Sequence, residues 1–178
     1  MSVIKERYQK EAIPALKKEF EYSNILAVPK IIKVVVNSGV GRIVDEKQRE
    51  IVQKSLSAIT GQHAVPRRAK KAIASFKTRL GQIIGYSVTL RGARMYEFLD
   101  RLVGIALPRT RDFKGIPATA FDGRGNLTIG VKEHIVFPEM IGEDVRFIFG
   151  LEVTIVTTAR TKEEGMSLLR SLGFPIQT

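Results

Sequence analysis

The chain has 178 residues, of which 44% are hydrophobic, and a formal net charge of +11. The absence of cysteine excludes disulfides and thiolate metal sites and is typical of the reducing cytoplasm. Because no apolar run of about 18 residues occurs, we expect no membrane-spanning helix. The length and composition predict a single domain over residues 1–178.

A helix and a strand are predicted for the first part of the chain. Apolar residues recur at helical spacing over residues 3–20, and Pro14 is expected to break or kink that helix. The strand covers residues 30–37, where apolar and polar positions alternate. The side chains expected on one face of this strand are Ile32, Val34 and Val36. Lys33 and Asn37 then share the other face, which is partly polar.

A helix is predicted next, from an Asp45 cap to Thr60, because apolar side chains recur at helical spacing and Gly61 follows as a stop. Two extended segments are expected after it, over residues 64–69 and 83–91. The alternation in the second segment predicts a half-buried strand whose exposed face carries Ser87 and Thr89.

The positive charge is concentrated between residues 51 and 96. This window contains nine Lys and Arg and no Asp or Glu, which leaves 20 basic against 18 acidic residues elsewhere. A protein that neutralises phosphates clusters its cations and keeps carboxylates away from them. A solvated basic face is the alternative, but the hydroxyl side chains among these cations favour contacts with the backbone of a nucleic acid.

A third helix is expected over residues 93–107, ended by Pro108, with Glu97 and Arg101 as an exposed ion pair one turn apart. Residues 109–125 show no period and predict a long loop. Loops of this length usually bind a partner, and disorder in the isolated protein is equally compatible with the pattern.

Two more strands are expected over residues 126–131 and 151–158, followed by a helix that begins at the capping box Thr161–Glu164. Strands and helices mix without a regular alternation of strand and helix. This order predicts an α+β fold with a largely antiparallel sheet.

Residues that could support catalysis are few. His63 and His134 have no ligand spacing to each other or to carboxylates, so a surface or locally bonded imidazole is expected rather than a metal ligand or general base. Glu143 and Asp144 form an acidic patch with Glu139, and adjacent carboxylates on a loop seldom make an acid–base pair. The segment 122–126 predicts a turn and lacks the carboxylates of a cation loop. We therefore expect no enzyme, no metal and no cofactor.

Segments along the whole chain closely resemble one protein family. They are Leu56–Gln62, Arg68–Ala74, Phe76–Lys77, Gly85, Val88–Arg91, Pro108–Gly115, Phe121–Asn126 and Gly173–Pro175. The family is that of bacterial ribosomal protein L5, which binds 5S rRNA in the central protuberance of the large subunit. The chain departs from the family pattern at Arg67, where a small polar residue is usual, and at Ser38, where Met or Gln is common.

The resemblance implies an antiparallel sheet with helices on one side, in a protein that is a monomer within the ribosome. It implies that Asn37, Gln62 and Thr89 hold 5S rRNA. The basic side chains expected to join them on 5S rRNA or on large-subunit rRNA are Lys33, Arg67, Arg68, Lys70, Lys71 and Arg91. The loop 72–81 of the family reaches peptidyl-site tRNA, which assigns this role to Lys77 and Arg79. The resemblance further implies that one segment faces small-subunit protein thirteen in an intersubunit bridge, and this segment contains Arg109, Arg111, Phe113 and Lys114.

The sequence therefore predicts a non-catalytic RNA-binding protein of the ribosome. Two alternatives use the same basic face: an RNA-processing enzyme and a DNA-binding architectural protein. The enzyme needs a convergent carboxylate or histidine near that face, where only His63 is available. The architectural protein needs wedge residues or dimer symmetry, and neither is visible in the sequence.

Overall fold

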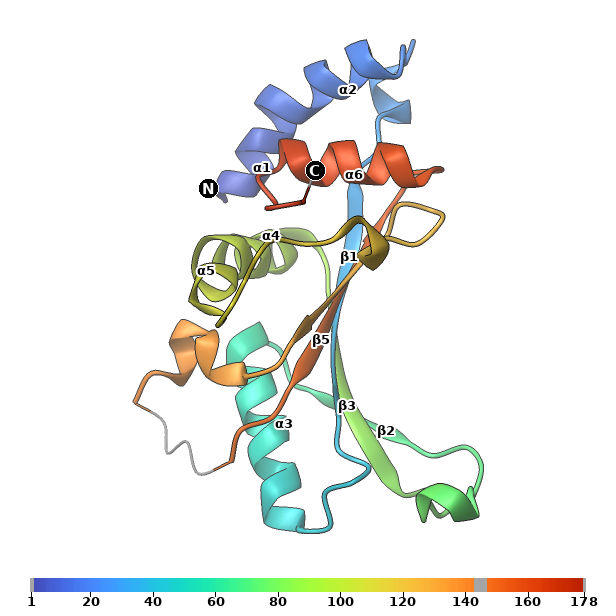
Figure 1. The fold of residues 1–178 in the computed structure, drawn as a ribbon, viewed down its shortest axis with the longest axis vertical. Coiled ribbons are helices and arrows are strands. Elements are labelled where there is room, and N and C mark those ends of the chain that lie inside the picture. The colour runs from blue at the N-terminus through green and yellow to red at the C-terminus, as the bar shows by residue number, and fades with distance from the viewer. Residues whose placement is uncertain (1, 143–146, 178) are drawn as a thin grey trace.

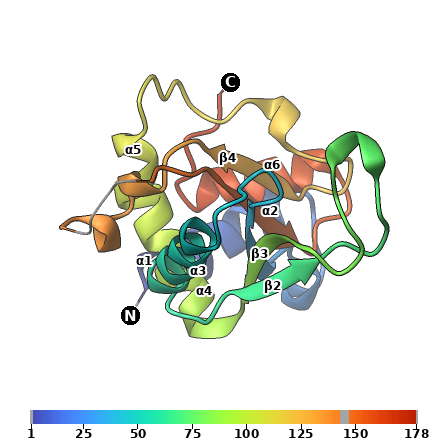
Figure 2. The same cartoon turned by 90° about the horizontal axis from the view of Figure 1, so that it is seen from below.

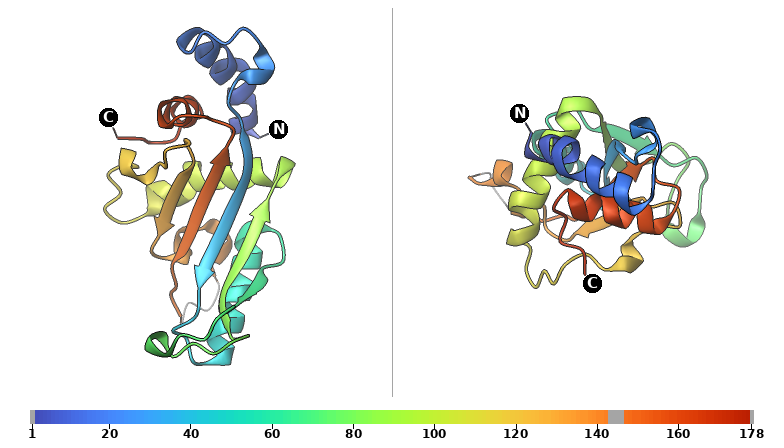
Figure 3. Two further views of the ribbon diagram at one scale, coloured as in Figure 1. Left: turned by 90° about the vertical axis from the view of Figure 1, so that its right-hand side faces the viewer. Right: turned by 90° about the horizontal axis from the view of Figure 1, so that it is seen from above.

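The computed structural model describes residues 2–142 and 147–177, and its centre is one antiparallel sheet in the order β2-β3-β1-β5-β4 (Figure 1). The strands are β1 (Ile31–Gly39), β2 (Val65–Arg68), β3 (Ile83–Leu90), β4 (Leu127–Val131) and β5 (Leu151–Thr157). The long helices α3 and α4 lie along one face, and no helix of the described residues covers the other (Figures 1 and 3). This arrangement confirms the predicted α+β fold. Glu143 and Asp144 of the predicted acidic patch lie outside the described residues.

The helices follow the predicted positions closely. They are α1 (Val3–Arg7), α2 (Ile13–Glu19), α3 (Glu46–Thr60), α4 (Gly92–Arg101), α5 (Leu107–Arg109) and α6 (Lys162–Ser171). The side chain of Asp45 accepts a hydrogen bond from the Lys47 amide at the start of α3, and Gly61 ends that helix with a φ of 66°. Thr161 caps α6 by accepting from the Glu164 amide. Sequence signals at helix ends therefore located α3 and α6 well.

Both prolines within α-helices follow a π-helical turn. Tyr8–Ala12 and Leu102–Ala106 have π geometry, and they are followed by Pro14 in α2 and Pro108 in α5. Proline cannot donate a hydrogen bond and its ring crowds the carbonyl four residues earlier, so a wider turn accommodates it without ending the helix. The prediction that Pro108 stops the helix was wrong, since the helix continues to Arg109.

A register shift changes the predicted pattern at the start of β1. The pairing of β1 with β5 is irregular between Ile31 and Lys33, so that Ile31 is buried and Ile32 is 43% exposed. An irregularity of this kind inserts an extra residue in one strand, so the side chains before it point to the opposite face of the sheet from the one expected. The prediction that Ile32 shares a face with Val34 and Val36 was wrong, because Val34 and Val36 are fully buried and Ile32 is not.

Arg101 pairs with Glu139 instead of Glu97. The Arg101 Nε and Glu139 Oε1 atoms are 2.6 Å apart, and Arg101 also donates to the Ile59 carbonyl at the end of α3. Both side chains are mostly buried, so the pair joins α4, α3 and the 3₁₀ turn Pro138–Met140. The predicted Glu97–Arg101 pair was wrong because a more buried carboxylate from a distant segment reaches the guanidinium.

The predicted long loop is attached to the rest of the protein at several points. Ile116 and Phe121 are buried, and Ile116 exchanges backbone hydrogen bonds with Pro175 and Gln177. Asp122 accepts hydrogen bonds from Arg124 and Asn126, which close the expected turn. Burial raises the pKa of Asp122, but these hydrogen bonds outweigh it and leave the pKa below its usual value.

Candidate nucleic-acid interface

The open face of the sheet is a polar surface, defined by the side chains that alternate with the core residues of β1, β3, β4 and β5. On β1 these are Lys33, Val35 and Asn37, because Val34 and Val36 face the helices. The strand register brings further polar side chains next to them. These are Ser87 and Thr89 on β3, Glu152 and Thr154 on β5, and Thr128 on β4.

Asn37 lies on β1, the central strand of the sheet. Its neighbours across the two flanking strands are Ser87 and Glu152. The Asn37 side chain is half-buried, which fixes its position while part of it is available for contact. An amide both donates and accepts hydrogen bonds, so Asn37 can recognise ribose hydroxyls or base edges.

Thr89 and Gln62, two of the residues that the resemblance assigns to 5S rRNA, lie close together. Gln62 follows the end of α3, and its Nε2 donates to the Thr89 carbonyl at 3.3 Å. Thr89 is half-buried, opposite Val35 in the sheet. The hydrogen bond to the strand holds the Gln62 side chain at the edge of the open face, where its amide oxygen can act as an acceptor.

Cations surround the open face. Lys33 lies on β1, and Arg67 on β2 donates from Nε to Ser87 Oγ at 2.5 Å. Ser87 was expected to be exposed, but Arg67 covers its hydroxyl and the side chain is buried. Arg68 and Arg91 are exposed at the ends of β2 and β3. In the described part of the chain the ion pairs are Lys10–Glu6 and Arg101–Glu139, so the four cations around the face carry uncompensated charge there. Cations without a carboxylate partner, next to hydroxyl and amide groups, can bind the phosphate and sugar oxygens of an RNA backbone.

Lys70, Lys71, Lys77 and Arg79 lie apart from the open face, on an arm formed by residues 69–82 (Figure 2). All four are exposed. The arm has hydrogen bonds of its own, since Ala69 and Gly81–Gln82 pair at its base and Ile73 pairs with Thr78 near its tip. No pattern in the sequence indicated this internal structure. The predicted RNA-binding residues thus form two groups, one on the sheet and one on the arm.

The residues expected at an intersubunit bridge occupy a third region. Arg109 ends α5, and Arg111 and Lys114 are exposed in the loop that follows, on a different side of the molecule from the arm (Figure 2). Phe113 is only partly exposed because it packs against the hydrophobic core. The three cations are therefore available for a partner, whereas Phe113 mainly anchors the loop.

Polar side chains on β5 and β4, which the sequence did not predict, also contribute to the open face. Glu152 is exposed beside Asn37, and the hydroxyl oxygens of Thr128 and Thr154 are 3.3 Å apart on the same face. The alternation in β5 could have placed Glu152 and Thr154 on one face, but not beside Asn37. Ser38, a departure from the family pattern, points the other way: it is buried and donates to the Gly150 carbonyl at 2.8 Å.

The two histidines lie in different environments. His63 is exposed, with its Nε2 3.3 Å from the side chain of Gln53. His134 is buried, stacks on Phe149 with ring centroids 4.0 Å apart, and accepts a hydrogen bond from the Phe149 amide at Nδ1. Over residues 2–142 and 147–177, no group of three or more His, Cys, Asp or Glu could hold a metal ion.

The environment of His134 predicts a loss of stability in mild acid. Burial lowers the pKa of His134 below its ordinary value of 6.5, so the unfolded chain binds the proton more tightly than the folded one. The neutral imidazole therefore contributes to the free energy of unfolding above pH 6.5. This contribution is lost as the pH falls through the pKa of the folded state. We expect the free energy of unfolding, measured by urea titration between about pH 7.5 and pH 5.5, to fall less in His134→Gln than in the natural protein. His63→Gln, which replaces the exposed histidine, is the matched control. The same pH dependence in both variants and in the natural protein would contradict the assignment.

No helix in the described ranges is long and apolar enough to cross a membrane.

Two family models together match most of the chain. The model described as "Ribosomal protein L5" matches residues 24–79, and a second model, which describes the C-terminus of the same ribosomal protein family, matches residues 83–176. Among curated proteins, the chain is 53% identical over 173 residues to the large ribosomal subunit protein uL5 of Streptococcus thermophilus strain ATCC BAA-491, covering 97% of this chain and 96% of that one. It is 52% identical over 176 residues to the uL5 protein of Halothermothrix orenii, covering 98% of each. It is 52% identical over 178 residues to that of Pelobacter propionicus, covering 99% of each.

Proposed function

This chain belongs to the ribosomal protein L5 family and is a structural, non-catalytic protein of the large ribosomal subunit, and we propose that it binds 5S rRNA through the open face of its sheet. The observation that supports this proposal most directly is the position of Asn37, Thr89 and Gln62. They come from distant parts of the sequence and lie on or beside one uncovered face, bordered by cations that have no carboxylate partner in the described residues.

The open face suits recognition of a folded RNA by shape. Lys33, Arg67 and Arg91 supply affinity for phosphates, which depends little on sequence. The half-buried Asn37 and Thr89 supply directed hydrogen bonds to riboses or base edges, because the strands hold them in fixed positions. Glu152 beside Asn37 repels phosphate, so we infer that this point of the face meets a ribose hydroxyl or an amino group of a base.

Two further contacts are proposed for regions away from the open face. Lys77 and Arg79 on the arm are suited to peptidyl-site tRNA, because an exposed basic projection can bind a ligand that arrives and leaves. Arg109, Arg111 and Lys114 are suited to a bridge to small-subunit protein thirteen. The separation of the three regions allows all three partners to be bound at once.

The proposal predicts that mutations in the open face and mutations in the arm weaken the binding of different RNAs. Asn37→Ala with Thr89→Ala should weaken 5S rRNA binding by about 1 to 3 kcal/mol, since polar partners on the RNA are left without hydrogen bonds. Lys77→Ala with Arg79→Ala should leave that affinity nearly unchanged and lower the occupancy of peptidyl-site tRNA on ribosomes that carry the variant. Filter binding to purified 5S rRNA and tRNA occupancy measure the two effects. If the arm variant loses 5S rRNA as severely as the face variant, the division proposed here is wrong.

A further inference from the structure

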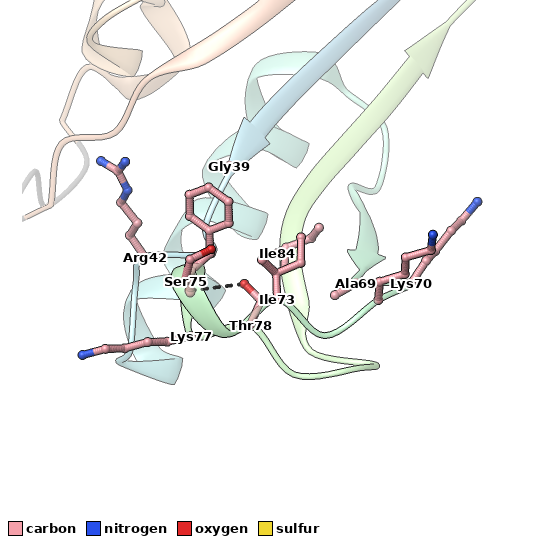
Figure 4. A pocket seen from close by; sticks show the side chains of 12 residues that line it. Gly39, Arg42, Ala69, Lys70, Ile73, Ser75, Lys77, Thr78 and Ile84 are labelled. Atoms are coloured by element: carbon pink, nitrogen blue, oxygen red, sulfur yellow. Dashed lines mark hydrogen bonds between the residues drawn. The ribbon is translucent and has the colours of Figure 1, made fainter.

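A pocket of about 860 Å³ lies between the arm and the turn that follows β1 (Figure 4). Figure 4 shows the side chains of Ile73 and Ile84 near its centre. Phe76 also lines it and is 71% exposed, an unusual state for a large aromatic side chain. The pocket thus combines an apolar floor with an aromatic ring that has little cover from the protein.

The rim of this pocket is positively charged. Arg42 and Lys77 extend outward on one side and Lys70 on the other (Figure 4). No Asp or Glu lines the pocket, and none of these three cations belongs to an ion pair in the described residues. The charge therefore favours an anionic occupant, while the floor favours a flat apolar surface.

Hydrogen bonds within the arm fix the shape of the pocket wall. Ile73 and Thr78 exchange backbone hydrogen bonds of 3.1 and 3.2 Å across the tip. Between them, Phe76 belongs to the 3₁₀ turn Ala74–Phe76, and Lys77 has a left-handed φ of 52° that reverses the chain. The turn keeps the ring away from the protein core. A preformed site loses less entropy when a ligand binds.

Resting on the proposed RNA-binding function, we propose that this pocket receives one unstacked nucleobase of a bound RNA. The base stacks on Phe76 and contacts Ile73 and Ile84, and the phosphates on either side of it meet Arg42, Lys70 and Lys77. Aromatic side chains bind unpaired bases in this way, and cations beside them bind the backbone. The polar side chains in the lining other than the cations are hydroxyls, so the pocket accepts any of the four bases. The base comes from ribosomal RNA or from tRNA.

The first test uses a nucleotide and its sugar phosphate alone. Adenosine monophosphate added to protein with labelled isoleucine methyl groups should shift the methyl signals of Ile73 and Ile84, and ribose 5-phosphate should not. Phe76→Ala should abolish the shifts. Leu80→Ala is the matched control, because Leu80 lies on the same arm, is also 71% exposed and does not line the pocket. Equal shifts with ribose 5-phosphate, or shifts produced only by an acidic peptide carrying a phenylalanine, would overturn the proposal.

The second test measures RNA affinity and identifies the source of the base. Loss of the stacked ring in Phe76→Ala should weaken binding of an oligouridylate by about 5- to 150-fold, whereas Phe76→Tyr and Leu80→Ala should remain near the natural affinity. If ribosomal RNA supplies the base, Phe76→Ala also weakens 5S rRNA binding. If tRNA supplies it, tRNA occupancy on ribosomes falls instead. Unchanged affinity for oligouridylate in Phe76→Ala would overturn the pocket proposal, while 5S rRNA binding that still depends on Asn37 and Thr89 would leave the proposed function standing.

Discussion

Gly165→Ala is expected to destabilise the protein by about 3 kcal/mol or more, because α6 and the turn before β4 are in backbone contact at this residue. A Cβ atom on Gly165 would overlap the Cα and the carbonyl of Gly125. Gly125 is held against the sheet, since its carbonyl accepts a hydrogen bond from Thr157 Oγ1 on β5. Relief of the overlap therefore requires α6 to separate from the strands.

A urea titration followed by circular dichroism measures this loss, with Gly104→Ala as the matched control. Gly104 also lies within a helical segment, and a Cβ there meets nothing within 4 Å. Its replacement should be neutral or stabilising by up to about 1 kcal/mol, as alanine favours a helix. Equal stabilities of the Gly165→Ala and natural proteins would show that the backbone contact is less tight than the geometry indicates.

Secondary structure was largely predictable because local chemistry determined it. The caps at Asp45 and Thr161 and the stop at Gly61 bound their helices where expected. The errors occurred where distant segments decide the outcome. The irregular pairing with β5 exchanged Ile31 and Ile32, and Glu139 displaced Glu97 as the partner of Arg101. Periodicity in one segment carries no information about the register or charge of another.

The candidate site was predictable to a similar extent. Alternation along β1 and β3 correctly placed Lys33, Asn37 and Thr89 away from the core. The proximity of Gln62 to Thr89 could not be obtained from spacing, because 27 residues separate them. Glu152 was missed for the same reason, since only the sheet order places β5 next to β1. The pocket beneath the arm depends on the Ile73–Thr78 pairing, for which the sequence has no distinct signature.

The affinity for 5S rRNA should depend steeply on salt. If the open face and its border neutralise about five to seven phosphates, the logarithm of the binding constant falls with the logarithm of salt concentration by about 0.7 to 0.9 per phosphate. Between about 50 and 200 mM salt, the affinity then drops by roughly two to four orders of magnitude. Filter binding at several salt concentrations measures this slope. A flat titration, or equal affinity for an unrelated DNA duplex, would contradict RNA recognition by this surface.

Two variants with the same change in net charge test whether the cations of the open face cause this salt dependence. Lys33→Gln with Arg67→Gln removes two cations from the face, and each phosphate that is no longer neutralised should reduce the slope by about 0.7 to 0.9. Lys17→Gln with Lys18→Gln removes two exposed cations from α2, which lies at the other end of the molecule from the arm (Figure 1), and should leave the slope unchanged. Because both variants lower the net charge by two, equal reductions in slope would mean that total charge, and not this surface, governs RNA binding. A reduction confined to the first variant would place the phosphates on the sheet, where the hydrogen-bonding side chains of Asn37 and Thr89 can select the RNA.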